Sequence, residues 1–432
     1  MCHFKDVLRF TSQQLSPTLA GTGIRVPAWT DPRNPYPYQG ANMSKTGLKI
    51  GIVGGGIGGL AAANALHNCG HQVTVFEQSQ QYLRVGADIN LTPNAVRALD
   101  GLGAGIAAAV RVSAARPTHR ISRNWDSGEE TSRLTMGNEA ERQYGAPQLT
   151  IHRADLLAAL ADAFPGEQVK FGRRVSRIAQ DDAGVAVEFA DGTRVEGLDA
   201  LIGSDGIHSV VRSALFGAEN PRFTGVVAFR TVVPTERVRD VPDIGAFTKW
   251  WGPTAESQIV TFPLNQGRDT FIFATTAQES WHEESWTTEG SVSELRGFYA
   301  GFHPHARALL DACDSVLKTA LYERDPLAQW SQGRVSLLGD ASHPMMPFMA
   351  QGAGMAIEDA VVLARNLDAA QDADGVPQAL QNYEAMRKQR TSQIQIGSRG
   401  NNWLRAGGNA DWVYGYDAWQ VALPSETSAC AV

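Results

Sequence analysis

The sequence predicts an α/β protein in which a parallel sheet flanked by helices is interrupted by a second, mainly antiparallel domain. Three observations support this fold class. Residues 49–77 read as strand, helix and strand, residues 222–280 alternate between apolar and polar side chains, and residues 335–338 return to a buried strand that helices follow. At 432 residues the chain also exceeds a single ordinary domain, which spans about 100–200 residues.

The individual elements follow from local signals. An apolar run over 49–53 stops at a glycine cluster, an alanine- and leucine-rich helix covers 60–66, and a second strand covers 72–76. Thr92 and Pro93 predict the N-cap and first position of a helix that ends at Gly101 or Gly103. Later expected elements are a helix over 153–164, strands over 169–203 with a hairpin turn at Asp191-Gly192, and helices at about 353–369 and 376–398.

This order predicts a domain that is interrupted and then resumed. The expected segments are an extension over 1–42, a first part of the cofactor domain over 43–120, a β-ribbon insertion over 121–150, a second part over 151–220, a substrate domain over 221–330, and a third part with C-terminal helices over 331–432. The extension is broken by prolines, shows no periodicity and precedes Met43. We expect it to be disordered, or to reflect a start codon assigned too early.

Composition limits the possible partners. A net charge of −7 and a sequence pI near 5.8 argue against a partner that is a nucleic acid or an anionic membrane. The four cysteines are far apart with no C-x-x-C pair, which gives no zinc motif or disulfide framework and is typical of reduced cytosolic thiols. No run approaches the roughly 20 apolar residues of a membrane span. We therefore expect a cytoplasmic enzyme, either a monomer or a homodimer.

A glycine motif indicates a dinucleotide. Residues 54–59 read Gly-Gly-Gly-Ile-Gly-Gly, a G-x-G-x-x-G pattern between strand and helix. Gly54 permits the tight turn, Gly56 lets the backbone approach a pyrophosphate, and Gly59 lets helix and strand pack closely. Glu77 follows the second strand, where a carboxylate accepts hydrogen bonds from an adenosine ribose. A glycine-rich turn used only for packing is the alternative. The predicted site comprises Gly54, Gly56, Gly58, Gly59 and Glu77.

Two later segments resemble motifs of the class A flavoprotein aromatic hydroxylases, which have the para-hydroxybenzoate hydroxylase-like fold. Residues 201–206, Leu-Ile-Gly-Ser-Asp-Gly, are similar to the Asp-Gly motif of that family. Residues 338–344, Leu-Gly-Asp-Ala-Ser-His-Pro, are similar to its Gly-Asp motif. With the glycine motif, the three stand in family order, and the resemblance extends over essentially the whole chain after Met43. It implies a Rossmann-like FAD-binding domain with an inserted substrate domain.

The resemblance implies one bound FAD, with NADH or NADPH as a co-substrate that visits the flavin without a domain of its own. In the family, Asp340 would hydrogen-bond the FAD ribitol, the helix that starts near Gly352 would face the flavin ring, and Arg153 would contact the cofactor. An ordinary helix N-cap remains the alternative for Asp340, and a surface arginine for Arg153. The cofactor residues that the resemblance adds are Arg153, Asp205, Asp340, Gly352 and Gly354.

Within the family, the chain resembles the salicylate, 3-hydroxybenzoate and 6-hydroxynicotinate hydroxylases most. The supporting stretches are 85–89, 150–153, 249–251 and 412–417. The implied reaction is reduction of FAD by NAD(P)H, addition of O2 to give a flavin C4a-hydroperoxide, and oxygen transfer to a small aromatic substrate, with or without loss of a carboxylate. An FAD-dependent oxidase or dehydrogenase without oxygen transfer is the alternative, and a non-enzymatic FAD-binding sensor is a third. Oxygen incorporation into product distinguishes them.

The substrate pocket departs from the family pattern. Several relatives have a histidine and a tyrosine where this chain has Gln258 and Phe262, and others have histidines at Asn90 and Phe348. We assign the catalytic positions to Gln258, Pro347 and Asn90. Neither Gln258 nor Phe262 titrates between pH 5 and 9, so the substrate should arrive already activated and kcat should follow the substrate's own ionisation.

Other polar side chains are weaker candidates. Arg230, Lys249 and Gln351 are possible pocket residues, but for Arg230 and Lys249 a solvated strand charge is favoured. Trp250 and Trp251 are expected in a core or interface. His343 is expected to have a structural role, and Trp281-His282 is a possible neighbour of the ring. If kcat depends on the same pKa with every substrate, His282 and His343 are the first residues to substitute in a search for the base.

Overall fold

The computed structural model describes residues 47–84, 88–281, 288–406 and 408–424. The extension expected over 1–42, residues 85–87 and His282 lie outside the described residues. No helix in these ranges is both long and apolar enough to cross a membrane.

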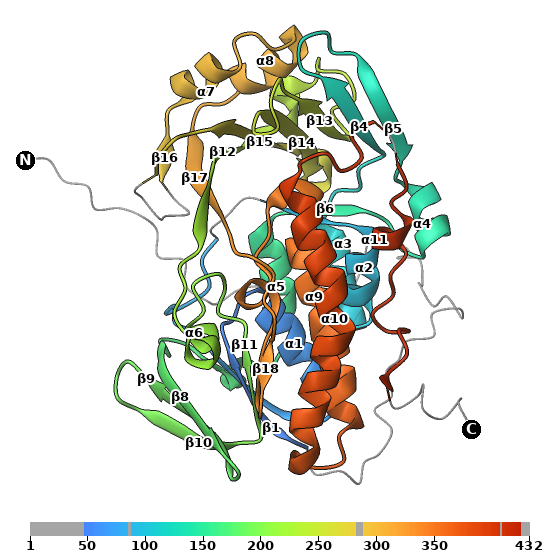
Figure 1. The fold of residues 1–432 in the computed structure, drawn as a ribbon. Helices are drawn as coiled ribbons and strands as arrows, with labels where there is room; N and C mark the ends of the chain where they lie inside the picture. The colour runs from blue at the N-terminus through green and yellow to red at the C-terminus, as the bar shows by residue number, and fades with distance from the viewer. Residues whose placement is uncertain (1–46, 85–87, 282–287, 407, 425–432) are drawn as a thin grey trace, which may run out of the picture. The chain divides into compact units, whose positions relative to one another are not determined.

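A six-stranded sheet forms the base of the cofactor domain (Figure 1). Its order is β18 (Ser331–Gln332), β19 (Val335–Leu337), β11 (Ala200–Gly203), β1 (Lys49–Val53), β2 (Gln72–Phe76) and β7 (Val169–Lys170). All neighbours pair in parallel except β18 with β19. The central strands therefore come from three distant parts of the sequence, as the interrupted domain predicts.

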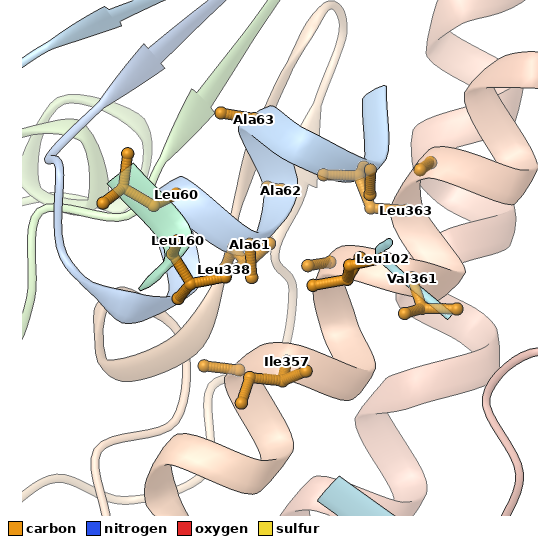
Figure 2. Close-up of a cluster of buried hydrophobic side chains, with 14 of the residues drawn as sticks. Leu60, Ala61, Ala62, Ala63, Leu102, Leu160, Leu338, Ile357, Val361 and Leu363 are labelled. Atoms are coloured by element: carbon orange, nitrogen blue, oxygen red, sulfur yellow. The ribbon is translucent and has the colours of Figure 1, made fainter. Parts of the chain in front are cut away.

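Helices cover one face of this sheet. They are α1 (Ile57–Asn68), α5 (Arg153–Asp162), α9 (Gly352–Ala369) and α10 (Val376–Arg399). Helix α1 packs against α9, and Figure 2 shows Ala61 of α1 in the same buried cluster as Ile357 and Val361 of α9. Small side chains on α1 allow this close approach of the two helices, because they leave little bulk between the backbones. Ala356, one turn into α9, thereby lies close to Gly58 in the first turn of α1.

The other face of the six-stranded sheet packs on a small antiparallel sheet. This sheet has β8 (Val175–Asp181), β9 (Gly184–Phe189) and β10 (Arg194–Leu198), and α6 (Val210–Phe216) packs beside it. Strand β1 shows how the faces are divided, since Ile50 and Ile52 point to the helices while Val53 joins the cluster with Val185 and Val187. Burial on both faces explains the continuous apolar run of this strand.

An eight-stranded sheet forms the second domain (Figure 1). Its order is β16 (Glu289–Gly290), β17 (Val316–Glu323), β12 (Arg222–Pro234), β15 (Asp269–Ala277), β14 (Gln258–Leu264), β13 (Phe247–Trp251), β4 (His119–Asn124) and β5 (Glu130–Thr135). The pairing is antiparallel except between β13 and β4. Two strands of the ribbon expected over 121–150 thus extend this sheet.

The two faces of the eight-stranded sheet have different partners. Its outer face packs against α7 (Val292–Phe298) and α8 (Pro304–Asp311). Its inner face carries a cluster that includes Phe262 and Phe271, and Met346 and Phe348 join it from the loop between β19 and α9. The short pair β3 (Ile89–Leu91) and β6 (Leu149–Ile151), with α2 (Pro93–Asp100), α3 (Ala104–Ser113), α4 (Asn138–Tyr144) and α11 (Asp411–Tyr414), completes the described regular elements apart from short 3-10 turns.

The fold class predicted from the sequence is confirmed: a Rossmann-like α/β domain with an inserted, mainly antiparallel sheet and C-terminal helices. The strands expected at 49–53 and 72–76 have those bounds, and the hairpin turn lies at Asp191-Gly192. The helix that begins at Pro93 has Thr92 as its N-cap and Gly101 as its C-cap.

Candidate active site

Of the three motif glycines Gly54, Gly56 and Gly59, only one has open space beside it in the described part of the chain. A Cβ on Gly54 would lie 2.5 Å from the Ser204 carbonyl oxygen, and one on Gly59 would lie 2.0 Å from the Gly54 carbonyl oxygen. Gly54 also has a φ of +100°, which favours glycine. A Cβ on Gly56 would meet no atom of the described residues within 4 Å. Protein packing therefore explains Gly54 and Gly59 but not Gly56.

The space beside Gly56 lies at the start of α1, where Gly56 is the N-cap and no side chain caps the helix. The first N–H groups of a helix have no intrahelical partner and attract anions. Glu77 fixes the loop, because its carboxylate accepts hydrogen bonds from Gly55 N (2.7 Å) and Ser79 N (2.8 Å). This arrangement fits a pyrophosphate against the backbone at Gly56, which is the observation that supports a bound dinucleotide.

The Asp-Gly and Gly-Asp motifs lie together. The carboxylate of Asp205 accepts hydrogen bonds from Ser209 Oγ (2.5 Å) and Val210 N (2.7 Å), and so holds the start of α6. The buried guanidinium of Arg212 on α6 donates to the carbonyl oxygens of Ala341 and Ser342 at 3.4 and 3.3 Å. Asp205 thus shapes the motif through its own backbone contacts, and Arg212 joins it to the second motif.

Arg153 and Asp340 act on each other electrostatically although they come from separate elements. Arg153 begins α5, and Asp340 lies in a 3-10 turn over Gly339–Ala341. Desolvation raises the pKa of the Asp340 carboxyl, while His343 and Arg153 oppose that shift. Desolvation likewise lowers the pKa of Arg153, and Asp340 opposes it. The structure therefore places both predicted cofactor residues in one charged neighbourhood.

The remaining predicted glycines serve close packing to different degrees. A Cβ on Gly58 would lie 2.7 Å from a Leu338 methyl carbon, and one on Gly354 would lie 3.1 Å from the Ala95 Cβ on α2. Gly352, the first residue of α9, has only Met345 nearby, at 3.9 Å. The first two glycines are thus explained by helix packing, whereas Gly352 leaves space at the helix start.

The inner face of the eight-stranded sheet presents the candidate substrate surface. Because side chains alternate along a strand, Gln258 shares a face with Val260 and Phe262. Gln258 is buried, and its side-chain oxygen has no hydrogen-bond partner among the described residues. Pro347 begins a 3-10 turn that delivers Phe348 to the same surface. Asn90, on β3, is buried and accepts a hydrogen bond from Gln148 (2.7 Å).

The expectation that Lys249 is a solvated strand charge is wrong. Its side chain is only 3% exposed and lies on the inner face, with Nζ 2.5 Å from Asn401 Oδ1 and 3.6 Å from the ring centroid of Trp251. It is buried because strands flank β13 on both sides and Phe348 approaches from the loop before α9. Trp250 and Trp251 are buried, as expected.

Arg230 is half-buried on the inner face beside Asp88. The expectation that it is a solvated strand charge is therefore also wrong. Its guanidinium donates to Thr319 Oγ1 and lies 5.3 Å from the ring centroid of Phe273. Desolvation raises the pKa of Asp88 to about 7, and Arg230 opposes the shift. Asp88 is therefore a carboxyl group that titrates near neutral pH beside the candidate substrate surface.

Two other polar candidates are held in structural contacts. Gln351 donates to Thr92 Oγ1 (2.9 Å) and accepts from Asn94 (3.1 Å), so its amide is used within the protein. His343 is buried with Nε2 2.6 Å from Asp359 Oδ2, which agrees with its expected structural role. Trp281 packs against the cluster on the outer face of the sheet, away from the candidate substrate surface.

Three residues of this site were not identified from the sequence. Tyr82 lies beside the glycine loop, and desolvation together with Glu77 raises the pKa of its hydroxyl to about 12. Asp88 and Arg120 also belong to the site, as Arg120 lies on β4 above the ring of Phe247. Side chains alternate between the two faces along β4, so Arg120 belongs to one of them. Only the pairing of β4 with β13 shows that this is the inner face of the sheet.

Comparisons with known proteins agree with this site. A family model described as "FAD binding domain" matches residues 48–396. The 6-hydroxynicotinate 3-monooxygenase of Bordetella bronchiseptica is 38% identical over 384 residues, which are 89% of this chain and 99% of that protein. The 3-hydroxybenzoate 6-hydroxylase of Polaromonas naphthalenivorans is 38% identical over 356 residues, 82% of this chain and 86% of that protein.

Solved structures give the same result. A structure described as a salicylate hydroxylase substrate complex superposes with a TM-score of 0.75 at 26% identity, covering 86% of this chain and 96% of that one. The resemblance inferred from the three motifs is thus confirmed, together with FAD as the cofactor. The chain belongs to this FAD-binding family, the class A flavoprotein aromatic hydroxylases.

Proposed function

We propose that this flavoprotein monooxygenase hydroxylates a small aromatic or pyridine carboxylic acid whose ring already carries a hydroxyl or amino group. NADH or NADPH would be the reductant and O2 the oxygen source. The observation that carries the proposal is the inner face of the eight-stranded sheet, where aromatic side chains meet the loop that precedes α9. The relatives named above are described as acting on 6-hydroxynicotinate and 3-hydroxybenzoate, which supports this substrate class.

The cofactor would be held by residues from three parts of the chain. The backbone at Gly56 would receive the pyrophosphate, Glu77 the adenosine ribose, and Arg153 and Asp340 the middle of the molecule. When bound, FAD supplies the two-electron chemistry that ring hydroxylation with O2 requires. Gly352 would allow the start of α9 to face the flavin ring.

The protein's own contribution is to position the ring and exclude water. Phe262, Phe271 and Phe348 form an apolar surface that would hold an aromatic ring. Gln258, Asn90 and Pro347 are the proposed contacts of the reacting ring, and neither amide takes up a proton near neutral pH. Activation must therefore come largely from the substrate's own electron-donating group. A cytosolic setting, which supplies reduced nicotinamide, is part of this proposal.

A substrate screen tests the proposal. Hydroxylated acids such as 6-hydroxynicotinate and salicylate are compared with nicotinate and benzoate, which lack the ring hydroxyl. We expect the hydroxylated acids alone to stimulate NAD(P)H oxidation and to yield a product with one added oxygen, detected by mass spectrometry. Stimulated oxidation that yields only hydrogen peroxide with every acid would support an oxidase instead.

A further inference from the structure

Two buried cations on the inner face have no carboxylate partner among the described residues. Lys249 is 3% exposed and Arg120 is 4% exposed, in a chain whose net charge is −7. Within the described ranges, the Lys249 ammonium donates only to the neutral side chain of Asn401. One terminal nitrogen of Arg120 is buried with no hydrogen-bond partner in the described part of the chain. Buried charges are normally paired, because removing a charge from water is strongly unfavourable.

The two cations share one face of neighbouring strands. In the parallel pair of β13 and β4, Phe247 is opposite Arg120 and Lys249 is opposite Ser122. Arg120 and Lys249 are therefore diagonal neighbours on the inner face. Gln258 is opposite Trp251 on β14, which makes it the diagonal neighbour of Lys249 on the other side. Lys249 thus lies beside Gln258, the proposed contact of the reacting ring, and Arg120 lies on the far side of Lys249, on β4.

Aromatic rings surround these charges. Lys249 Nζ lies 3.6 Å from the ring centroid of Trp251 and 5.6 Å from that of Phe348, which comes from the loop before α9. Arg120 Cζ lies 4.7 Å from the ring centroid of Phe247, and that ring stacks on Phe262. Ring faces attract cations, but they do not neutralise charge. The surroundings match a ligand that is an aromatic ring with one negative group.

Electrostatics favour such a ligand. Burial holds the pKa of Lys249 well below its usual range, and the positive charges of Arg120 and Arg405 lower it further. The charged form of Lys249 is therefore disfavoured without a ligand, and an incoming anion would favour it and offset the repulsion from Arg120. A carboxylate accepts several hydrogen bonds at once and can therefore serve both groups.

We propose that Lys249 and Arg120 form a carboxylate-binding subsite that anchors the acid group of the aromatic substrate; this inference rests on the proposed function. The subsite fixes the ring against the inner face with its acid group toward β13 and β4. It also selects acids over neutral rings of the same shape, because a neutral amide leaves the cations unpaired.

Binding to the FAD-loaded enzyme without NAD(P)H tests the subsite. Dissociation constants are measured by calorimetry for two matched pairs, 6-hydroxynicotinate with its amide and salicylate with salicylamide. We expect the wild type to prefer each acid, and Lys249→Met to weaken acid binding by about 10- to 100-fold while amide binding changes little, as for loss of a charge-assisted hydrogen bond. Lys249→Arg should retain part of the preference, and Arg120→Met should lose part of it.

Arg123→Met is the matched control. Arg123 lies on β4 on the opposite face, where it pairs with Asp243. Acid preference should persist in this variant, and FAD content should match the wild type in all variants. An unchanged preference in both Lys249→Met and Arg120→Met, or equal weakening of acid and amide, would overturn the subsite.

A measurement on the wild type alone guards against variants that fail to fold. Calorimetry in two buffers of different ionisation enthalpy reports proton uptake, which we expect when an acid binds because the anion raises the pKa of Lys249. The amides should bind without uptake, and equal uptake for both would overturn the proposal. If the proposed function itself were wrong, the result would differ from a failure of the subsite alone. The wild type would then bind neither the acid nor the amide of either pair.

Discussion

The guanidinium of Arg387 on α10 lies 2.7 Å from the carboxylate of Asp359 on α9, and neither side chain is exposed. Arg387 also contacts Glu358 at 2.8 Å, while His343 lies against the other oxygen of Asp359. Burial alone would raise the pKa of Asp359, but His343 and Arg387 outweigh it and hold the pKa below its usual value. This buried network joins the Gly-Asp motif to the two long helices, α9 and α10.

Arg387→Met should therefore destabilise the fold severely. Removing the shared cation leaves Asp359 and Glu358 buried with fewer partners, and such changes reduce the free energy of unfolding by about 3–5 kcal/mol. Arg194→Met is the control, because Arg194 pairs with Glu196 on the surface and its loss should change stability by less than about 1 kcal/mol. Denaturant unfolding measures both variants. Equal stability of the two would show that the network contributes no net stability.

Gly56→Val should yield a folded protein that holds no FAD. A Cβ at Gly56 would meet no atom in the described part of the chain within 4 Å, so the apoprotein should keep its melting temperature, but the side chain would occupy the space beside the pyrophosphate. Gly105→Val is the control, since a Cβ on that exposed helical glycine also meets nothing within 4 Å. Flavin absorbance after gel filtration gives the FAD content. A yellow Gly56→Val protein with full occupancy would place the pyrophosphate elsewhere.

Lys249→Met should stabilise the substrate-free protein at neutral pH. The unfolded lysine is charged below its ordinary pKa of 10.5, whereas the folded state disfavours that charge, so the wild type loses stability as pH falls below this value. Removing the buried cation should raise the free energy of unfolding by about 1 kcal/mol at pH 7. The gain should shrink as pH rises toward 10.5. A less stable Lys249→Met protein at pH 7 would mean that packing of the lysine stem outweighs its charge.

Asp88→Asn should change how stability depends on pH. The pKa of Asp88 rises from 3.8 to about 7 on folding, so between these values the folded state retains a proton that the unfolded state has lost. The free energy of unfolding therefore falls as pH rises through this window. The wild type and Asp88→Asn should be similarly stable near pH 4, and the variant more stable above pH 7. Thermal unfolding of the FAD-free proteins tests this, and parallel profiles would refute the raised pKa.

Local chemistry made much of the fold predictable. The turn at Asp191-Gly192 needs a positive φ, which is +80° at Gly192, and the Asp191 side chain accepts a hydrogen bond from Thr193 N (3.0 Å). The first strand and the glycine loop are equally local, since each residue's role follows from its neighbours in sequence. Such features could be predicted because their partners lie within a few residues.

The substrate surface depends on pairings that local sequence does not reveal. Strand β13 pairs with β4, which comes more than a hundred residues earlier, and Lys249 bonds Asn401, which lies 152 residues later. Without these contacts, a lysine in an alternating strand is indistinguishable from a solvated one. Gln351 is the opposite case. The sequence predicts it as a pocket residue, but its amide is used in contacts with Thr92 and Asn94, which lie far away in the sequence.

Transfer of oxygen from O2 to the ring is the central claim, and labelled O2 tests it most directly. The FAD-loaded enzyme is supplied with NAD(P)H, the best acid from the screen and ¹⁸O2 in unlabelled water, and the product is analysed by mass spectrometry. We predict one ¹⁸O atom in each hydroxylated product molecule. Product without the label, with hydrogen peroxide formed in proportion to the NAD(P)H consumed, would contradict the account.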